Sequence, residues 1–258
     1  MFKFALLFLI VNFASSIAMA EETQPVTTLL GVGVWSRPAY DGADSTHAVA
    51  IPVVRYYGRP WFVRTTFGML EGGARTELLS GFTLGAQLAY EGGRDSAESE
   101  FLAAHNFPTI TPNISWGVHA EWEGKVGAMP LIALLRYRQN ADRTRGEQID
   151  LRLTAGILSY AGINAGVFSQ STWADSTSSN FMYGVDAQQA ANSGLRTYTA
   201  AGGELFNAIG LLWSYDINPQ WSLLGSVERR QLRGIVTNSP LLQINTSQYA
   251  SLGLAYQF

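Results

Sequence analysis

The chain has no cysteine among its 258 residues. A disulfide framework, a thiolate metal site, a cysteine nucleophile and a lipid-modified thiol all need cysteine, so all four are excluded. Lysine is almost absent too, since 15 of the 17 basic residues are arginine. The planar guanidinium of arginine pairs with carboxylates through two hydrogen bonds, which favours ion pairs between side chains as the role of these residues.

Charge of either sign is scarce, at 14% of the chain, and the formal net charge is −3. Nucleic-acid binders carry a basic patch or stripe, so we expect no nucleic-acid partner. Hydrophobic residues make up 47% of the chain and aromatic residues 12%. This content is enough to offset the entropy of ordering, which excludes a disordered chain. The length fits one domain.

Long apolar runs are missing beyond the first 13 residues. Lys3, the apolar run from Phe4 to Phe13 and the small residues before Glu21 form the pattern of a secretory signal peptide. The alternative, an uncleaved anchor, would need about 20 apolar residues. We therefore predict a signal peptide over residues 1–20, cleavage after Ala20, and a mature domain over residues 21–258 outside the cytoplasm.

Instead of helical periodicity, the mature chain alternates apolar with small or polar residues at the two-residue period of a strand. In the last segment, one face carries Ala250, Leu252, Leu254, Tyr256 and Phe258, and the other face is more polar. This alternation fits a soluble β-sandwich, whose apolar rows face each other. It also fits an outer-membrane barrel, whose apolar rows face lipid.

Three features favour the barrel. The segments are long enough to cross a bilayer at a tilt. Aromatic residues such as Trp61, Trp122 and Tyr160 stand at segment ends, where a membrane interface holds them. Short connections alternate with long ones. We predict an all-β fold, a transmembrane antiparallel up-and-down β-barrel with short periplasmic turns and long outer loops.

The strand count must be even if both chain ends lie in the periplasm. We predict twelve strands, with ten as the alternative. Eleven segments are visible, at residues 26–36, 47–56, 60–70, 81–91, 112–123, 126–138, 148–159, 162–171, 204–217, 221–231 and 247–258. The twelfth is expected at residues 75–79, after a turn at Glu71-Gly72-Gly73. As the final residue of the last strand, Phe258 is expected to act in barrel assembly.

Charged residues on the inward rows predict a lumen filled by ion pairs. A lipid-facing arginine near the bilayer midplane would cost about 2–4 kcal/mol, so the charged rows are expected to face inward. The predicted network consists of Arg64, Glu91, Glu121, Asp150, Arg152, Glu204, Glu228 and Arg230. We therefore expect a narrow or occluded lumen.

Catalytic and metal-binding groups are few, because the chain has three histidines, His47, His105 and His119. Ser115 shares a face with His119, but four residues of strand separate them by about 13 Å, beyond hydrogen-bond reach. Acidic residues gather between Asp95 and Glu100, at a spacing that matches no ion-binding loop. We predict no catalytic residue, no cofactor and no metal site.

The segment from Thr172 to Gly203 is the longest connection, and long loops commonly bind partners or cover a site. Two interpretations stay open: a loop that binds a partner, and a lid that stabilises the rim of the barrel. The candidate interaction residues are Trp173, Asp175, Phe181, Tyr183 and Tyr198.

Several motifs resemble the MipA/OmpV family of outer-membrane proteins. They are Gly31-Val32-Gly33-Val34, residues 38–44, residues 90–95, Thr172-Trp173-Ala174-Asp175, Tyr183-Gly184-Val185, Ser193-Gly194-Leu195 and residues 252–258. The resemblance implies a barrel in the outer membrane of a Gram-negative bacterium. It also implies a scaffold that brings a lytic transglycosylase together with a bifunctional penicillin-binding peptidoglycan synthase. Other family members resemble surface antigens or adhesins.

Three functions are therefore considered. The first is a non-enzymatic scaffold or adhesin, which is in contact with the lipid bilayer and lipopolysaccharide and binds a lytic transglycosylase and a penicillin-binding protein. The second is a narrow channel for small polar solutes, which the charged lumen suggests. The third is an outer-membrane hydrolase or acyltransferase, which only the presence of the three histidines suggests.

Overall fold

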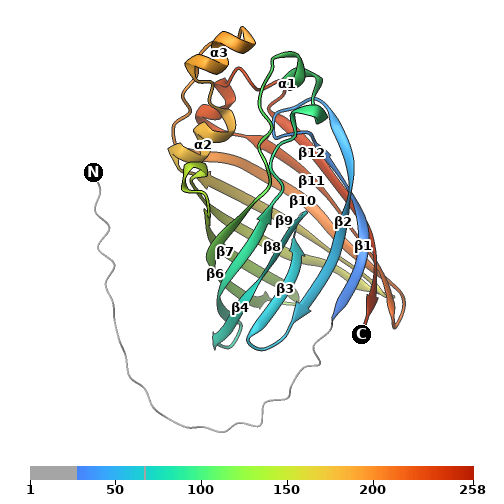
Figure 1. Cartoon of the computed structure of the whole chain (residues 1–258). Coiled ribbons are helices and arrows are strands. Elements are labelled where there is room, and N and C mark those ends of the chain that lie inside the picture. The colour runs from blue at the N-terminus through green and yellow to red at the C-terminus, as the bar shows by residue number, and fades with distance from the viewer. Residues whose placement is uncertain (1–27, 67) are drawn as a thin grey trace, which may run out of the picture.

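Twelve antiparallel strands form a closed barrel in the computed structural model, which describes residues 28–66 and 68–258 (Figure 1). Each strand pairs with its neighbours in the chain, and β1 pairs with β12 to close the barrel. The strands are β1 (Leu29–Pro38), β2 (Thr46–Tyr57), β3 (Trp61–Thr66), β4 (Met69–Leu79), β5 (Phe82–Glu91), β6 (Asn113–Val126), β7 (Met129–Asn140), β8 (Glu147–Tyr160), β9 (Ile163–Ala174), β10 (Gly203–Asn218), β11 (Trp221–Leu232) and β12 (Thr246–Gln257). The predicted count of twelve is confirmed, whereas the predicted signal peptide and the Ala20 cleavage site lie outside the described residues.

Large apolar side chains cover the outer face of the barrel. On β1 and β12, Val32 (74% exposed) lies opposite Leu254, and Val34 lies opposite Leu252. Because cross-strand partners share a face, these rows form one continuous apolar surface. An apolar outer face of this kind lets a closed sheet lie against hydrocarbon. None of the helices in the described ranges has the length and apolar content needed to cross a membrane.

Short turns gather at one end of the barrel and long loops at the other (Figure 1). The long loops carry the helical segments η1 (Ser96–Glu98), α1 (Glu100–Ala104), η2 (Arg143–Arg145), α2 (Ser176–Tyr183), α3 (Ala187–Ser193) and η3 (Gly234–Asn238). Figure 1 shows these helices standing above one mouth of the barrel, at the end opposite the C-terminus. We call this layer the cap. In outer-membrane barrels the end with short turns faces the periplasm, so the cap faces outward.

Two predicted turns are misplaced. The segment predicted as one strand over residues 60–70 is split, because β3 ends at Thr66 and β4 begins at Met69. Glu71-Gly72-Gly73 therefore lies inside β4 and is not a turn. The break predicted between the segments 112–123 and 126–138 is also misplaced, since β6 continues to Val126. Glycine marked a turn in both predictions, but in a narrow barrel it also allows neighbouring backbone to approach closely.

The wall of the barrel has one weakly paired seam. β2 and β3 pair at only three positions, Arg55 with Arg64, Tyr56 with Val63 and Tyr57 with Phe62. On its other side, β2 pairs with β1 along ten positions. The shortness of β3, six residues long, leaves the outer part of β2 without a partner strand on that side. We call this place the β2–β3 seam.

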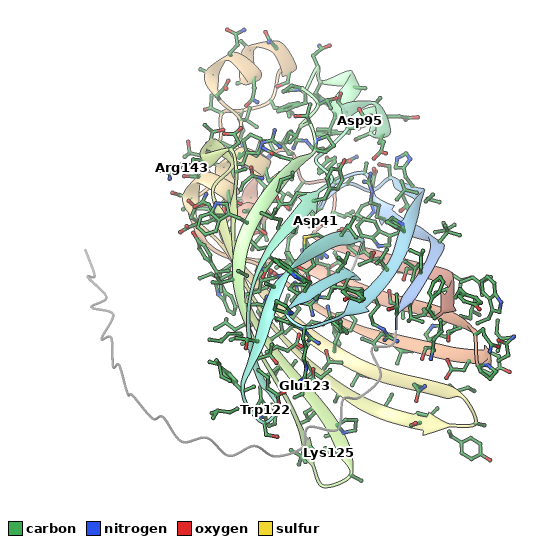
Figure 2. All side chains as sticks on the ribbon, turned by 60° about the horizontal axis from the view of Figure 1, so that its bottom comes forward. Asp41, Asp95, Trp122, Glu123, Lys125 and Arg143 are labelled. Carbon is green, nitrogen blue, oxygen red and sulfur yellow. The ribbon has the colours of Figure 1, made fainter. Side chains whose placement is uncertain are left out.

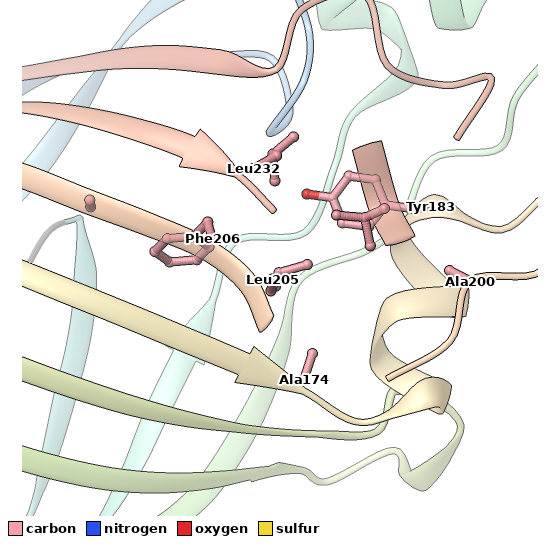
Figure 3. Packing of buried hydrophobic residues seen from close by; sticks show 8 residues of the cluster. Ala174, Tyr183, Ala200, Leu205, Phe206 and Leu232 are labelled. Atoms are coloured by element: carbon pink, nitrogen blue, oxygen red, sulfur yellow. The ribbon is translucent and has the colours of Figure 1, made fainter. Parts of the chain in front are cut away.

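The cap is held to the barrel by two apolar clusters. The first joins Tyr183 of α2 to Phe206 of β10, Leu232 of β11 and Val236 of η3 (Figure 3). The second joins Leu102 of α1 to Val185 and Leu241 in neighbouring loops. Since these loops come from distant parts of the sequence, the cap is a packed layer and not a set of independent loops.

Candidate functional site: the lumen and its cap

A buried carboxylate, Glu71 on β4, is the centre of the ion-pair network in the lumen. Its Oε1 lies 2.5 Å from Arg64 Nε, and its Oε2 lies 2.8 Å from Arg136 Nη1. The Glu71 side chain has no exposed area, and that of Arg136 is 7% exposed. Arg64 Nη1 also lies 3.2 Å from Glu121 Oε2 on β6. These contacts link β3, β4, β6 and β7 across the interior.

Asp150 on β8 extends the network. Its Oδ2 lies 2.9 Å from Arg136 Nη2 and 3.2 Å from Arg138 Nε, and its Oδ1 accepts a hydrogen bond from Thr172 Oγ1 at 2.8 Å. Arg138 in turn pairs with Glu91 Oε1 on β5 at 2.9 Å. We call this whole set the ion-pair band. Each carboxylate meets at least one arginine, which offsets the cost of burying both charges.

A second cluster lies on the opposite wall, around Arg230 on β11. Its guanidinium pairs with Asp41 Oδ2 at 2.8 Å and with Glu228 Oε1 at 2.9 Å. The same group lies over the rings of Phe206 and Tyr249, at 4.1 and 4.4 Å from their centroids. Since Asp41 belongs to the loop after β1, this cluster ties the cap to the barrel wall.

The structure brings most of the predicted lumen residues together, and Glu204 is the exception. On the inner face, Arg152 contacts an aromatic ring and an amide. Arg152 lies over the Phe168 ring at 3.7 Å and donates to Gln170 Oε1 at 3.4 Å. Glu204 does not face the lumen. It lies opposite Trp173, which is on the outer face, because a bulge between Glu204 and Phe206 shifts the register of β10 against β9. A bulge reverses the face of every residue beyond it, and the two-residue count carried no sign of one.

Three members of the ion-pair band were missed from the sequence. Glu71 was assigned to a turn. Arg136 and Arg138 follow the stretch Met129–Leu135, in which both alternating rows are apolar. Alternation is lost when the inner face is as apolar as the outer face, so the inward direction of these arginines was hidden. The signal that identifies them is the outward row Leu131, Ala133 and Leu135. When this row is continued along the strand, Arg136 and Arg138 fall on the inward row.

The candidate interaction residues of the 172–203 segment are placed mainly within the cap. The Asp175 carboxylate caps α2 by accepting from Ser178 N at 2.7 Å, and it also accepts from Glu147 N at 3.1 Å. Tyr183 is 3% exposed in the apolar cluster of Figure 3. Tyr198 donates to the Ile235 carbonyl, Arg145 lies over the Phe181 ring, and Trp173 lies on the outer face of the barrel.

Burial shifts the pKa values of three groups in the cap. Burial raises the pKa of Tyr40 to about 12, although the nearby Arg94 guanidinium acts in the opposite direction. Tyr40 donates a hydrogen bond to the Leu241 carbonyl at 2.7 Å. Burial also raises the pKa of Tyr183 and lowers the pKa of Arg94. Arg94 donates to the Met182 carbonyl at 2.9 Å, so it fastens α2 to the loop after β5.

Two cavities lie in the barrel, and they adjoin at Trp35, Thr66 and Gly68, which line both. A cavity of about 360 Å³, the outer vestibule, is lined by Asp41, Arg138, Arg230, Phe181 and Tyr183 beneath the cap. A cavity of about 600 Å³, the inner chamber, is lined mainly by apolar residues that include Ile51, Val53, Ile132, Leu212 and Leu224. The lumen therefore has two compartments with different chemistry. Figure 2 shows Asp41 toward the cap and Lys125 at the opposite end, beside the β6–β7 turn.

The three histidines are engaged in structural contacts. His119 lies on the inner face, where its Nδ1 contacts Gln87 Oε1 and its ring meets the Phe62 ring edge-on. The Ser115 hydroxyl has no hydrogen-bond partner among the described residues, so it does not contact His119. His105 Nδ1 lies 2.8 Å from the Phe101 carbonyl, and His47 contacts the Glu98 carbonyl. Within residues 28–66 and 68–258, no group of three or more histidine or acidic residues is arranged to hold a metal ion.

A closed twelve-stranded barrel with an apolar outer belt, a charged lumen and short turns at one end defines an outer-membrane β-barrel protein. The sequence profile of the MltA-interacting protein MipA family matches residues 30–258, and the chain belongs to this family.

The chain is similar to two named relatives over nearly the whole length of each. The chain is 25% identical to the MltA-interacting protein of Escherichia coli K12, over the full length of both. It is 23% identical to outer membrane protein YiaT of Escherichia coli O157:H7, over 93% of this chain and 94% of that protein. Among solved structures, the NanC porin matches 89% of this chain and 100% of its own, with a TM-score of 0.48 and 9% identity. The COG4313 outer membrane channel of Pseudomonas putida F1 matches 94% and 100%, with a TM-score of 0.45 and 10% identity.

Proposed function

We propose that this protein is a non-enzymatic interaction protein of the outer membrane that binds a lytic transglycosylase and, with it, a penicillin-binding peptidoglycan synthase. The observation that carries the proposal is the ion-pair band, whose buried arginines and carboxylates link strands across the interior, beneath the apolar contacts that hold α2 to the rim of the barrel. A lumen filled in this way suits a rigid anchor better than a transport path. The name of the full-length relative supports an interaction role.

The proposed docking surface is the periplasmic end, because peptidoglycan enzymes act on that side of the membrane. This end carries the short turns, and its exposed residues include Lys125 near the end of β6 and Tyr160 (76% exposed) at the end of β8. The outer belt is proposed to contact the bilayer and lipopolysaccharide. The cap residues Trp173, Asp175, Phe181, Tyr183 and Tyr198 are proposed to stabilise the rim, since their contacts are internal to the cap and barrel wall.

Lys125 offers a direct test, because it is the sole lysine of the chain after Lys3. An amine-reactive crosslinker added to cells that also contain a lytic transglycosylase should join the two proteins through Lys125, as mapped by mass spectrometry. In the control Lys125→Arg, the charge stays but the reactive amine is lost, so this crosslink should disappear. Binding measured with the purified proteins should be equal for the two forms.

Absence of binding between the purified proteins, at concentrations above those in the envelope, would reject the proposal. Binding that survives while every crosslink maps to cap residues would reject the periplasmic docking surface. Surface display of an intact cap without any enzyme partner would instead favour the adhesin role.

A narrow channel is the second candidate. The two adjoining cavities, which leave unfilled space in the lumen, favour it. Swelling of vesicles that contain the protein, in isotonic solutions of small sugars, would support this function. The histidine contacts support the non-enzymatic part of the proposal, and replacing each histidine by alanine should leave envelope lipid turnover unchanged.

A further inference from the structure

The inner chamber combines apolar walls with one exposed cation. Its apolar lining comes from inward-facing residues of several strands, chiefly Ile51, Val53, Ile132, Leu212 and Leu224. Ile132 is 39% exposed although it faces the interior, so this apolar surface is open to the cavity. At about 600 Å³ the cavity falls within the range of roughly 300–1,000 Å³ of small-molecule sites.

The cation is Arg55 on β2. It is exposed and lines the same cavity. Its cross-strand partner is another arginine, Arg64, which is already paired with Glu71 and Glu121. No ion pair or hydrogen bond joins the Arg55 guanidinium to another of the described side chains. A like charge directly opposite cannot serve as a partner, so an anion beside Arg55 would supply the counter-charge that Arg64 does not.

The chamber also reaches the barrel wall at the β2–β3 seam. Ile51 and Val53 line it from β2, while Thr65 and Thr66 line it from the end of β3. Pairing across this seam stops at Arg55 and Arg64. The unpaired edge of β2 beside the chamber is the place where an acyl chain from the surrounding bilayer would enter without passing the ion-pair band or the cap.

We infer that the inner chamber binds a single-chain anionic amphiphile taken from the bilayer, such as a long-chain carboxylate. The acyl chain packs against Ile132, Leu212 and Leu224, and the anionic head pairs with Arg55. A charged residue inside a membrane-spanning wall commonly marks a functional site, and here the site is suited to a lipid. This ligand is independent of the proposed enzyme partner, because it binds inside the lumen and not at the turns.

The site can be tested with a photoreactive palmitic acid that carries a diazirine in its chain. The protein is placed in lipid nanodiscs and irradiated, and the labelled peptides are mapped with and without excess palmitate. We expect competed labelling on peptides that contain Ile51, Ile132 and Leu224. Competed labelling confined to the outward rows that contain Val32 and Leu254 would overturn the inference, because the probe would then sit at the lipid surface alone.

Two variant pairs sharpen the test. Arg55→Gln should lower competed labelling of the chamber about tenfold, which is the effect of losing a charged hydrogen-bond partner. The control Arg229→Gln changes an outward arginine on β11 and should have no effect. Ile132→Trp should block the chamber, whereas its outward neighbour Leu131→Trp should not.

A neutral probe, the corresponding diazirine alcohol, distinguishes charge recognition from general apolar binding. It should label the wild type and Arg55→Gln equally. Equal labelling of both forms by the acid would contradict a role for Arg55. Heat-modifiable mobility on gels confirms that each variant is folded, and if Ile132→Trp fails to fold, the Arg55 pair still decides the outcome.

Discussion

The two halves of the lumen are built from different side chains. Toward the cap, arginines and carboxylates such as Arg136, Glu71 and Asp150 pair across the interior. Toward the short turns, Ile132 and Leu224 leave an apolar chamber. The outer belt is apolar around both halves. A membrane barrel therefore need not have a polar lumen along its whole length, and its two halves can serve different purposes.

The largest effect is expected in the ion-pair band. Glu71→Ala leaves Arg64 and Arg136 buried without this carboxylate, and breaking a buried pair in this way costs about 3–5 kcal/mol. The urea midpoint of unfolding in lipid vesicles measures this loss of stability. Glu98→Ala is the control, because Glu98 pairs with Arg37 at the rim with 26% of its side chain exposed. A loss within about 1 kcal/mol is expected there, and equal losses would contradict the special place of Glu71.

The next effect separates the outer belt from the lumen. Leu151 faces outward on β8, so Leu151→Arg places a charge in hydrocarbon and should cost about 2–4 kcal/mol. Thr154 lines the inner chamber on the same strand, and Thr154→Arg should be milder. The effects of the two variants are measured by the assembly yield and by the fraction of heat-modifiable protein. Equal impairment by the two variants would mean that the faces of β8 are assigned wrongly.

A smaller effect is expected at a glycine that packs against the apolar lining of the inner chamber. A Cβ at Gly253 would lie 2.7 Å from Val53 Cγ2, so Gly253→Ala should cost about 1–3 kcal/mol through overpacking. At Gly92 nothing lies within 4 Å, and Gly92→Ala should be neutral. Thermal unfolding of the two variants is the measurement. A Gly253→Ala protein as stable as the wild type would show that the chamber wall yields easily.

The smallest effect concerns the cap. Tyr40→Phe removes the hydrogen bond to the Leu241 carbonyl and should cost about 1 kcal/mol. Because burial raises the pKa of Tyr40 to about 12 from 10.0, its contribution is complete below pH 10 and is lost as the pH rises toward 12. Proteolysis of the cap should therefore accelerate in this range for the wild type, and less so for Tyr40→Phe. If proteolysis accelerates equally in the wild type and in Tyr40→Phe, the loss of cap stability at high pH belongs to another group, such as Tyr183.

The sequence predicted the fold well where the two faces of a strand differ. On β5, β6 and β12 the outward rows follow the two-residue alternation, and the strand count of twelve is correct. Alternation reports only a difference between faces, so it failed on β7, where both rows are apolar beside the inner chamber. It also could not reveal the bulge after Glu204, which depends on the pairing of β10 with β9.

The candidate site was predictable to a similar extent. Arg64, Glu121 and Asp150 were found because each stands in a clearly alternating row. Glu71 was missed because its two following glycines were interpreted as a turn, although they lie in β4. The cap contacts of Tyr183 and Asp175 join segments that are distant in the chain, and no local pattern encodes such contacts.

The most direct test of the divided lumen is ion conductance in planar bilayers. The ion-pair band should obstruct the native barrel, so we expect no stepwise conductance for the wild type. Arg136→Ala, which removes the residue that bridges Glu71 and Asp150, should give steps. Stable conductance steps of the same size in the wild type and in Arg136→Ala would contradict a lumen closed by these ion pairs.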